Sequence, residues 1–390
     1  MAGRVLTPMA LLPFLALLLP SLVTAKCECG YSVNKTSDEP HMVWTDMMET
    51  DFLHIDDLSN QTNSLGHSMN NIGWVPQAYN VSAEDARGQR GKMAQVENVV
   101  ANPLMDRSEW AGQALSPGDP GLQLIVRSTL VDNMVPFGEL VSTRTDMRYG
   151  SFRVQMKMSW VPGTCGAFFM LHNNTQEIDF EFLSKQYNSS SSPVNLVLHS
   201  PESAAAGFDA SKLVDNFKVH PLPFRPDAGF HEYRFDWLPD RVSFYADGNW
   251  LWDMLDNVPN SGGHLVLNHW SNADPNWSAG PPEQDSIMTV SYVKAYFNSS
   301  DSQRQHDYFL RCPDDTKLKD GKNVCVITEP EKEENDDTSK TDFFSSDPKN
   351  RKNQTVFDDW PSSGGRMTPG GAAWAAGVAF ALVMAVVGLP

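Results

Sequence analysis

The stretch Glu177-Ile178-Asp179-Phe180-Glu181 is where this sequence says most about its fold. Three carboxylates alternate with two bulky apolar residues, and residues two apart in a β-strand point to the same face. The pattern therefore predicts a strand with Glu177, Asp179 and Glu181 on one surface and Ile178 and Phe180 in a core on the other. Asp and Glu are poor strand formers, and neighbouring negative charges repel, so the arrangement needs a reason.

The residues alone leave three explanations of this acidic strand open. The first is an ordinary solvated face, although such faces usually include Thr, Lys or Ser to relieve the repulsion. The second is a cation site, although loops that bind hard cations favour Asp and Asn around a turn glycine. The third is catalysis, because cleavage of a glycosidic bond uses two carboxyl groups with different pKa values. We favour catalysis.

Short alternating apolar runs, broken by Gly, Pro, Asn and Asp, continue on both sides of this strand. The predicted strands are 122–127, 138–143, 151–158, 167–171, 176–183, 195–199, 231–237, 241–246, 264–270 and 288–297. Asp247-Gly248 is a signal for a tight hairpin between 241–246 and 249–254. Many short strands without a long helical periodicity predict an all-β fold, either a β-sandwich or a jelly roll.

Both ends of the sequence carry secretory signals. Residues 1–25 combine a basic start at Arg4, a short apolar run and a small-residue cleavage site before Lys26, which predicts a signal peptide. Residues 362–390 begin with small residues, continue with a short spacer and end with an uncharged apolar stretch. This order predicts a signal that is replaced by a glycosylphosphatidylinositol anchor, with a spanning helix as the alternative. The expected location is the outer face of the plasma membrane or the cell wall.

Charge and sequons agree with an exported, carbohydrate-related protein. The net charge of −18 argues against nucleic acid as a partner, whereas a neutral polysaccharide tolerates an acidic surface. Eight Asn-x-Ser/Thr sequons fit passage through the secretory route. They are Asn34, Asn60, Asn80, Asn173, Asn188, Asn276, Asn298 and Asn353.

The sequence has five cysteines, and outside the cell cysteines usually pair. Cys27 and Cys29 are too close in sequence to pair comfortably with each other. We therefore expect them to bond to Cys312 and Cys325 in an order that the sequence leaves open, with a Cys312–Cys325 loop as the alternative. Cys165 lies in an apolar run and is expected to be a buried free thiol.

The composition changes after residue 300. Residues 328–352 are dominated by charged and small polar residues, and such a segment buries too little apolar surface to order itself. The sequence therefore predicts one folded domain over 26–300. A largely disordered acidic stalk, 301–361, follows it and carries Cys312 and Cys325.

The segments 149–157, 166–169 and 177–183 resemble glycoside hydrolase family 16. So do 230–237, 244–248, 267–270 and 290–296, in family order, and the likeness is greatest to the licheninase-like branch and to fungal wall-associated members. The resemblance implies a concanavalin A-like β-jelly roll with a concave substrate-binding sheet. It implies no cofactor beyond a structural calcium ion on the convex sheet, for which the sequence has no obvious loop. By the motif, Glu177 would be the nucleophile, Asp179 its hydrogen-bonded helper and Glu181 the general acid/base.

The spacing of the two glutamates bears on the mechanism. Four strand residues separate their Cα atoms by roughly 13 Å. Retaining glycosidases hold their two carboxyl groups about 5–5.5 Å apart. Side chains that lean toward each other over a concave sheet close most of this gap, and Asp179 between them can share a proton with Glu177. Given a concave sheet, the residues therefore favour retention.

Aromatic and amide side chains near this strand are candidate sugar contacts. Asn268 and Trp270 share one face of their strand, and Asn195 and His199 share one face of theirs. Trp277 is a further candidate, in tension with a glycan on the preceding Asn276. Phe168 and Phe169 alternate, so one of them faces the cleft; the sequence does not say which, and Phe168 is the candidate. The full set is Phe168, Asn195, His199, Asn268, Trp270 and Trp277.

Two departures limit what the resemblance implies. Thr175 stands where licheninase-like relatives usually have Trp, and Gln176 stands where Asp is common, so mixed-linkage specificity is not carried over. The sequence predicts a monomeric, retaining, endo-acting glycoside hydrolase on β-1,3 or mixed β-1,3/1,4-glucans of the cell wall. A transglycosylase would use the same carboxylates. A glucan-binding lectin that has lost catalysis and a structural wall protein are the non-enzymatic alternatives.

Overall fold

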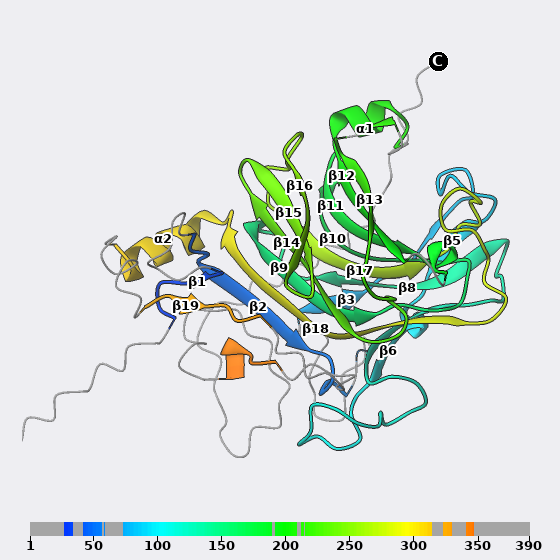
Figure 1. Ribbon diagram of the computed structural model, residues 1–390, viewed down its shortest axis with the longest axis horizontal. Coiled ribbons are helices and arrows are strands. Elements are labelled where there is room, and N and C mark those ends of the chain that lie inside the picture. Colours follow the sequence, from blue (N-terminus) through cyan, green and yellow to red (C-terminus); the bar gives the residue numbers. More distant parts are fainter. Residues whose placement is uncertain are drawn as a thin grey trace, which may run out of the picture.

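The computed structural model describes residues 27–33, 42–56, 58, 73–188, 192–208, 212–213, 215–313, 323–329 and 341–346. Within these ranges the chain folds into two large stacked β-sheets, with short helices at the margins (Figure 1). The prediction of an all-β sandwich is therefore confirmed.

Nine strands form the sheet that carries the acidic strand. Their order is β13-β12-β11-β10-β17-β8-β5-β4, and β3 also pairs with β8. The bounds are β3 (Trp74–Pro76), β4 (Tyr79–Val81), β5 (Gly91–Ala94), β8 (Met134–Ser142), β10 (Cys165–Asn173), β11 (Gln176–Leu183), β12 (Pro193–His199), β13 (Phe217–Pro221) and β17 (His264–Trp270). In Figure 1 this sheet rises toward helix α1 (Pro201–Ala205) on one side and toward β5 on the other. We call its free face the concave face.

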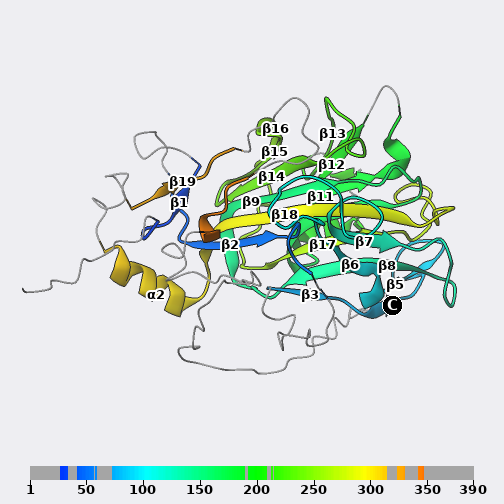
Figure 2. The ribbon, with the colours of Figure 1, turned by 90° about the horizontal axis from the view of Figure 1, so that it is seen from below.

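The second sheet has eight strands in the order β16-β15-β14-β9-β18-β7-β6, and β2 also pairs with β18. The bounds are β2 (Asp46–Asp51), β6 (Val99–Asn102), β7 (Gly121–Val126), β9 (Met147–Lys157), β14 (His231–Leu238), β15 (Arg241–Ala246), β16 (Asn249–Met254) and β18 (Ser286–Ser299). Figure 2 shows β18, β2 and β7 side by side in this sheet, whose free face we call the convex face. A separate parallel pair joins β1 (Tyr31–Ser32) to β19 (Cys325–Val326). Short 3₁₀ helices lie at Val96–Asn98, Ser184–Gln186 and Phe344–Ser346.

The hydrophobic core lies between the two sheets and is rich in aromatic rings. Ile178 and Phe180 of β11 are fully buried in it. Phe180 packs edge-on against Phe244 of the second sheet, with 5.2 Å between ring centroids. The predicted period of two over 177–181 is therefore confirmed, because the apolar residues enter the core and the carboxylates lie on the concave face.

Each of the ten predicted strands exists, and 176–183, 241–246 and 264–270 have the predicted bounds. The hairpin prediction is also confirmed. Asp247 and Gly248 both adopt positive φ, 48° and 74°, which is the two-residue turn that matches strand twist. The sequence missed the short strands β3 to β6 and also β2, whose Asp-Met-Met-Glu-Thr-Asp sequence does not alternate.

Two disulfides join the N-terminal segment to the C-terminal part of the chain. Cys27 bonds to Cys325 and Cys29 bonds to Cys312, while Cys165 is a buried free thiol. The expected pairing is confirmed, and the structure settles the connectivity that the sequence left open.

The prediction of a largely disordered stalk is wrong for 301–313, 323–329 and 341–346. Helix α2 (Ser302–Arg311) begins directly after β18, with Asp301 as its N-cap. Glu329 accepts hydrogen bonds on the convex face from Arg153 at 3.2 Å and from Arg234 at 2.5 Å. Phe343 stacks on Trp110 with 5.7 Å between centroids. Composition alone could not predict this, because it does not show that a few side chains of the polar segment, such as Glu329, contact buried charged residues on the convex face. Buried charges need such partners.

Several predictions lie outside the described residues. These are the signal peptide, the anchor signal, and the sequons Asn34, Asn60 and Asn353. Of the other sequons, Asn80, Asn173, Asn188 and Asn276 are exposed and Asn298 is half-buried. None of the helices in the described ranges is long and apolar enough to cross a membrane.

These contacts predict that the stable folded unit extends to about residue 346. A chain ending at Ser300 would lose both disulfides, Glu329 and Phe343. The two disulfides close loops of 298 and 283 residues, and the chain-entropy model assigns each about 5 kcal/mol. We expect the chain ending at Ser300 to unfold at much lower denaturant than a control chain ending at Ser346. Equal denaturation midpoints would contradict the extended boundary.

Candidate active site

Strand β11 places its three carboxylates side by side in the concave sheet. β11 lies between β10 and β12, and its register puts Glu177 opposite His199 and Glu181 opposite Asn195 of β12. Asp179 is almost fully buried, and the two glutamates are half-buried. Directly opposed residues on antiparallel strands lie on the same face, so both β12 side chains accompany the acidic row.

Glu177 and Asp179 act as one titrating unit. The interaction between their carboxyl groups raises the pKa of Asp179 and lowers that of Glu177, which favours protonation of Asp179 over Glu177. Burial raises the pKa of Asp179 well above its ordinary range, and the charges of Glu177 and Glu181 raise it further. Burial, assisted by the charge of Glu181, raises the pKa of Glu177 to about 7. Closely spaced carboxyl groups share protons because they cannot all ionise.

Glu181 has different surroundings from Glu177. The indole Nε1 of Trp277 donates to its carboxylate at 3.4 Å, and the thiol of Cys165 does so at 3.6 Å. Asn195 donates to the Glu181 backbone carbonyl at 3.1 Å. Burial raises the pKa of Glu181, and the two side-chain hydrogen bonds act in the opposite direction. The two glutamates are therefore held by separate sets of neighbours.

One carboxylate oxygen of this group has no hydrogen bond among the described residues. It is Oδ2 of Asp179, and His199 Nε2 lies 3.9 Å from it. Burial lowers the pKa of His199 to about 4, so the ring is neutral near pH 7. Glu177, Asp179 and His199 offer ligand atoms within 4.8 Å of one another, the one such group of three in the described ranges. This group lies on the concave side and is therefore not the calcium site expected on the convex sheet.

Five of the six predicted sugar contacts lie on the concave face or beside it, and the sixth enters the core. Trp270 is half-buried at the end of β17, and Asn268 is buried two residues before it. Trp277 turns toward Glu181, whereas the adjacent Asn276 is exposed, so the tension between a cleft role and a glycan is resolved. Whether these side chains contact a sugar stays a prediction.

The sixth, Phe168, is a wrong prediction. Its ring is fully buried in the core, 5.5 Å from that of Phe235, because β10 pairs it with Phe180. The next residue, Phe169, faces the concave side and packs with Val266. The alternation of the two residues was predicted correctly. The pairing of β10 with β11 decides which of them faces the core, and this pairing cannot be read from the sequence.

Sequence reasoning missed a polar group beside Asn268. Glu139 of β8 accepts from Asn268 Nδ2 at 3.1 Å and from the Tyr79 hydroxyl at 3.0 Å. Lys92 of β5 places its ammonium 4.4 Å from the centre of the Trp270 ring. Burial raises the pKa of Glu139 and lowers that of Lys92, and the opposite charges partly offset both effects. The sequence signal for this polar group was Glu139 itself, which stands inside the apolar run 134–141. A charged residue that is buried with such a run needs polar partners nearby.

A loop from the far edge of the sheet reaches the segment after α1. Arg87, between β4 and β5, donates to the Gly207 carbonyl at 3.3 Å, and its guanidinium lies 4.8 Å from the Phe208 ring centre. Asn272, which follows β17, holds the loop by donating to the Ala86 carbonyl at 2.7 Å. The charge of Arg87 favours ionised Glu177 and Glu181.

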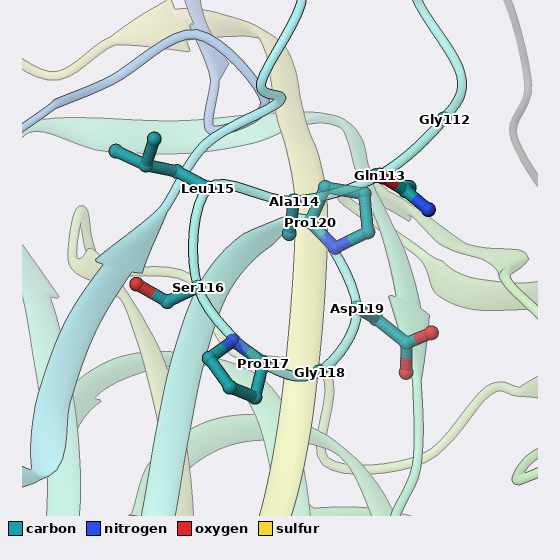
Figure 3. A pocket seen from close by; sticks show the side chains of 9 residues that line it. All are labelled: Gly112, Gln113, Ala114, Leu115, Ser116, Pro117, Gly118, Asp119 and Pro120. Carbon is teal, nitrogen blue, oxygen red and sulfur yellow. The ribbon is translucent and has the colours of Figure 1, made fainter.

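A hollow in the surface lies apart from the acidic strand β11. Gly112 to Pro120 line it, and all nine residues belong to one loop, as Figure 3 shows. The side chain of Asn102 holds the loop through bonds to Ser116 and Asp119. Asp119 pairs with Lys157, so the hollow brings no group of catalytic residues together.

Comparison with known proteins agrees with this geometry. The model of the family described as glycosyl hydrolases family 16 matches residues 107–288, which include the acidic strand. This part of the chain is therefore similar to members of glycosyl hydrolase family 16. The resemblance read from the sequence is therefore confirmed.

Relatives of this family 16 segment include bacterial enzymes. A β-glucanase of Acetivibrio thermocellus is 32% identical over 127 residues, which cover 31% of this chain and 34% of that protein. A β-glucanase of Paenibacillus polymyxa is 26% identical over 206 residues, or 52% of this chain and 76% of that protein. The solved β-glucanase of Bacillus licheniformis aligns at 19% identity and a TM-score of 0.45, over 64% of this chain and 97% of that one. The chain spans only 34% and 36% of the two Acetivibrio thermocellus relatives.

The raised pKa of Glu177 gives a prediction about stability. Its ordinary value is 4.5 and its folded value is about 7. The charged form is therefore disfavoured in the folded state, and the resulting destabilisation is absent below pH 4.5, grows as pH rises, and is complete above about pH 7. Glu177→Gln should raise the free energy of unfolding at about pH 8 and change it little at about pH 4.

Urea denaturation at the two pH values measures this difference. The exposed residue Glu283 provides the matched control, Glu283→Gln, which should have little effect at either pH. An equal gain for Glu177→Gln at both pH values would show that packing, rather than charge, explains the effect.

Proposed function

We propose that this protein is a retaining glycoside hydrolase that cleaves internal β-1,3 or mixed β-1,3/1,4 bonds of cell-wall glucans. The observation that carries the proposal is the different environment of the two glutamates. Glu177 lies beside Asp179, whose pKa is raised well above its ordinary range by burial, whereas Glu181 accepts hydrogen bonds from Trp277 and Cys165. Two carboxyl groups with separate environments can take the separate roles that retention needs.

In the first step, the Glu177 carboxylate attacks the anomeric carbon and Glu181 gives its proton to the departing glycosidic oxygen. In the second, the ionised Glu181 takes a proton from water, whose oxygen displaces Glu177 from the sugar. Asp179 donates its proton to Glu177 and so stabilises that carboxylate when it leaves. Burial raises the pKa of Glu181 and so favours its protonated form at the start of the cycle.

The concave face offers contacts that suit a neutral sugar chain. Trp270 presents an aromatic ring, while Asn268 and Glu139 present hydrogen-bonding groups from adjacent strands. The relatives are named β-glucanases, which supports a β-glucan as the substrate class. The choice between β-1,3 and mixed linkages, the cell-wall location, the lipid anchor and the monomeric state stay predictions.

A transglycosylase is the second candidate, because a sugar hydroxyl can replace water in the second step without any change of residues. A lectin that has lost catalysis is less well supported. A binding protein gains nothing from three buried carboxyl groups whose repulsion has to be relieved by a shared proton. Product sizing on a defined oligosaccharide separates the two enzymes, since only transfer gives products longer than the substrate.

The proposed roles predict different defects for the two glutamates. Glu177→Ala should abolish turnover and retain glucan binding, because the nucleophile acts mainly in the transition state. Glu181→Ala should be as slow on glucans but much less impaired on an aryl glycoside, whose leaving group needs no proton. Asp179→Asn should cost less than either. Steady-state kinetics on laminarin, lichenan and an aryl glycoside measure all three.

Azide rescue then tests which glutamate forms the covalent bond. The Glu181 variant should give a β-glycosyl azide through the intermediate, and the Glu177 variant should give an α-azide by direct displacement. An α-azide from the Glu181 variant, or inverted sugar from the wild-type protein, would reverse or remove the assignment.

A further inference from the structure

Two exposed tryptophans lie close together outside the catalytic face. Trp250 and Trp252 belong to β16, the edge strand of the second sheet, and are 55% and 37% exposed. Their rings are nearly parallel, with 6.4 Å between centroids and 25° between planes. Exposing the apolar surface of an indole ring to water is unfavourable, and adjacent exposed apolar rings are typical of binding sites.

Neighbouring side chains hold both rings in place. The Trp250 indole nitrogen donates to Asp253 Oδ1 at 2.9 Å. The Lys218 ammonium lies 3.9 Å from the centre of the Trp252 ring. The rings are therefore set before any ligand binds, which lowers the entropy lost on binding.

The size and surroundings of the pair select the class of ligand. A stable protein partner buries at least about 1,200 Å² in total. Two aromatic side chains bury about 300–500 Å² at most, and Trp250 and Trp252 are only 55% and 37% exposed, so the pair offers less than this. The flanking groups Asn249, Lys218 and Asp253 are polar and can hydrogen-bond to hydroxyls. A flat apolar surface bordered by hydrogen-bonding groups suits a pyranose ring, which has C–H faces and an equatorial rim of hydroxyls.

The position of the pair connects it with the candidate active site. Lys218 lies on β13, the edge strand of the concave sheet, and its contact with Trp252 places β13 beside β16. The preceding residue, Phe217, lies 6.1 Å from Trp277, which donates to Glu181. Successive strand residues point to opposite faces, so β13 borders the catalytic face on one side and the tryptophan pair on the other. Stacked sheets are about 10 Å apart, so a polysaccharide chain that passes over β13 has only a short distance to cover between the concave face and the tryptophan pair.

We propose that Trp250 and Trp252 form a second glucan-binding site, which holds the polysaccharide where it leaves the concave face over β13. This inference rests on the proposed function for the identity of the ligand. The site binds chain outside the cleft, and so it matters for polymers and not for substrates short enough to lie on the concave face alone.

The test compares polymer binding with turnover of a short substrate. Binding of laminarin and lichenan is measured by affinity electrophoresis of the full chain carrying Glu177→Ala, which prevents cleavage. Adding Trp250→Ala and Trp252→Ala together should weaken polymer binding about tenfold or more. The same two substitutions in the otherwise wild-type chain should leave turnover of an aryl glycoside of two glucose units unchanged. Phe309→Ala on α2, which removes an exposed ring far from β16 in sequence, is the matched control and should change neither.

Each outcome separates this site from the proposed function. Unchanged polymer binding by the double variant, in a protein that cleaves glucan, overturns the second site and leaves the hydrolase. Tryptophan-dependent binding without cleavage by the wild-type chain keeps the site and removes the hydrolase. A dimer that the double variant converts to monomer in light scattering would make the pair an interface between copies and overturn the proposal.

Discussion

Everything on the concave face depends on the burial of three carboxyl groups in a row on β11. The phase of the strand is fixed by Ile178 and Phe180, which belong to the core and cannot face water without a large loss of hydrophobic free energy. The three carboxyl groups that alternate with them must then lie on the concave face, where burial raises the pKa of each one. The core contacts of the strand therefore hold the carboxyl groups in a place that disfavours their charged forms. The repulsion within the row is relieved because the raised pKa of Asp179 favours its neutral form and because hydrogen bonds from Trp277 and Cys165 stabilise the Glu181 carboxylate.

The groups that stabilise the Glu181 carboxylate come from three parts of the chain. Cys165, on the neighbouring strand β10, and Trp277, in the loop between β17 and β18, donate hydrogen bonds, whereas Arg87, between β4 and β5, acts through its charge. Trp277 and Arg87 are far from β11 in sequence and have no local reason to lie near it. The acidic strand is therefore tolerable only in the assembled sandwich, and the site forms when both sheets and their loops are in place.

The same distinction explains what the sequence could predict. Alternation within one strand is local, so the acidic row, the hairpin at Asp247-Gly248 and most strands could be found from the residues. The phase of Phe168 and Phe169, the pairing of Asn268 with Glu139 and the short strands β3 to β6 depend on neighbours across the sheet, which no single segment reveals. Gln176, one of the two positions that depart from family expectation, shows this as well. It accepts from the backbone amides of Asn260 and Ser261 at 3.0 Å each, and so holds a distant loop.

The convex face carries buried basic side chains, and segments from the C-terminal part of the chain contact them. Arg153 is fully buried in the second sheet, and Arg234 and Lys294 are buried nearby. Burial lowers the pKa of Lys294 to about 8, so its charge is maintained only with partners. Glu329 contacts both arginines, and Thr341 and Asp342 accept from Lys294. A segment that composition assigns to solvent thus adds partners to buried cations of the second sheet, where Glu232 and Asp236 already pair with Arg153 and Arg234. Pairing is worth far more to a buried cation than to an exposed one, so a few such contacts outweigh the polar character of the residues between them.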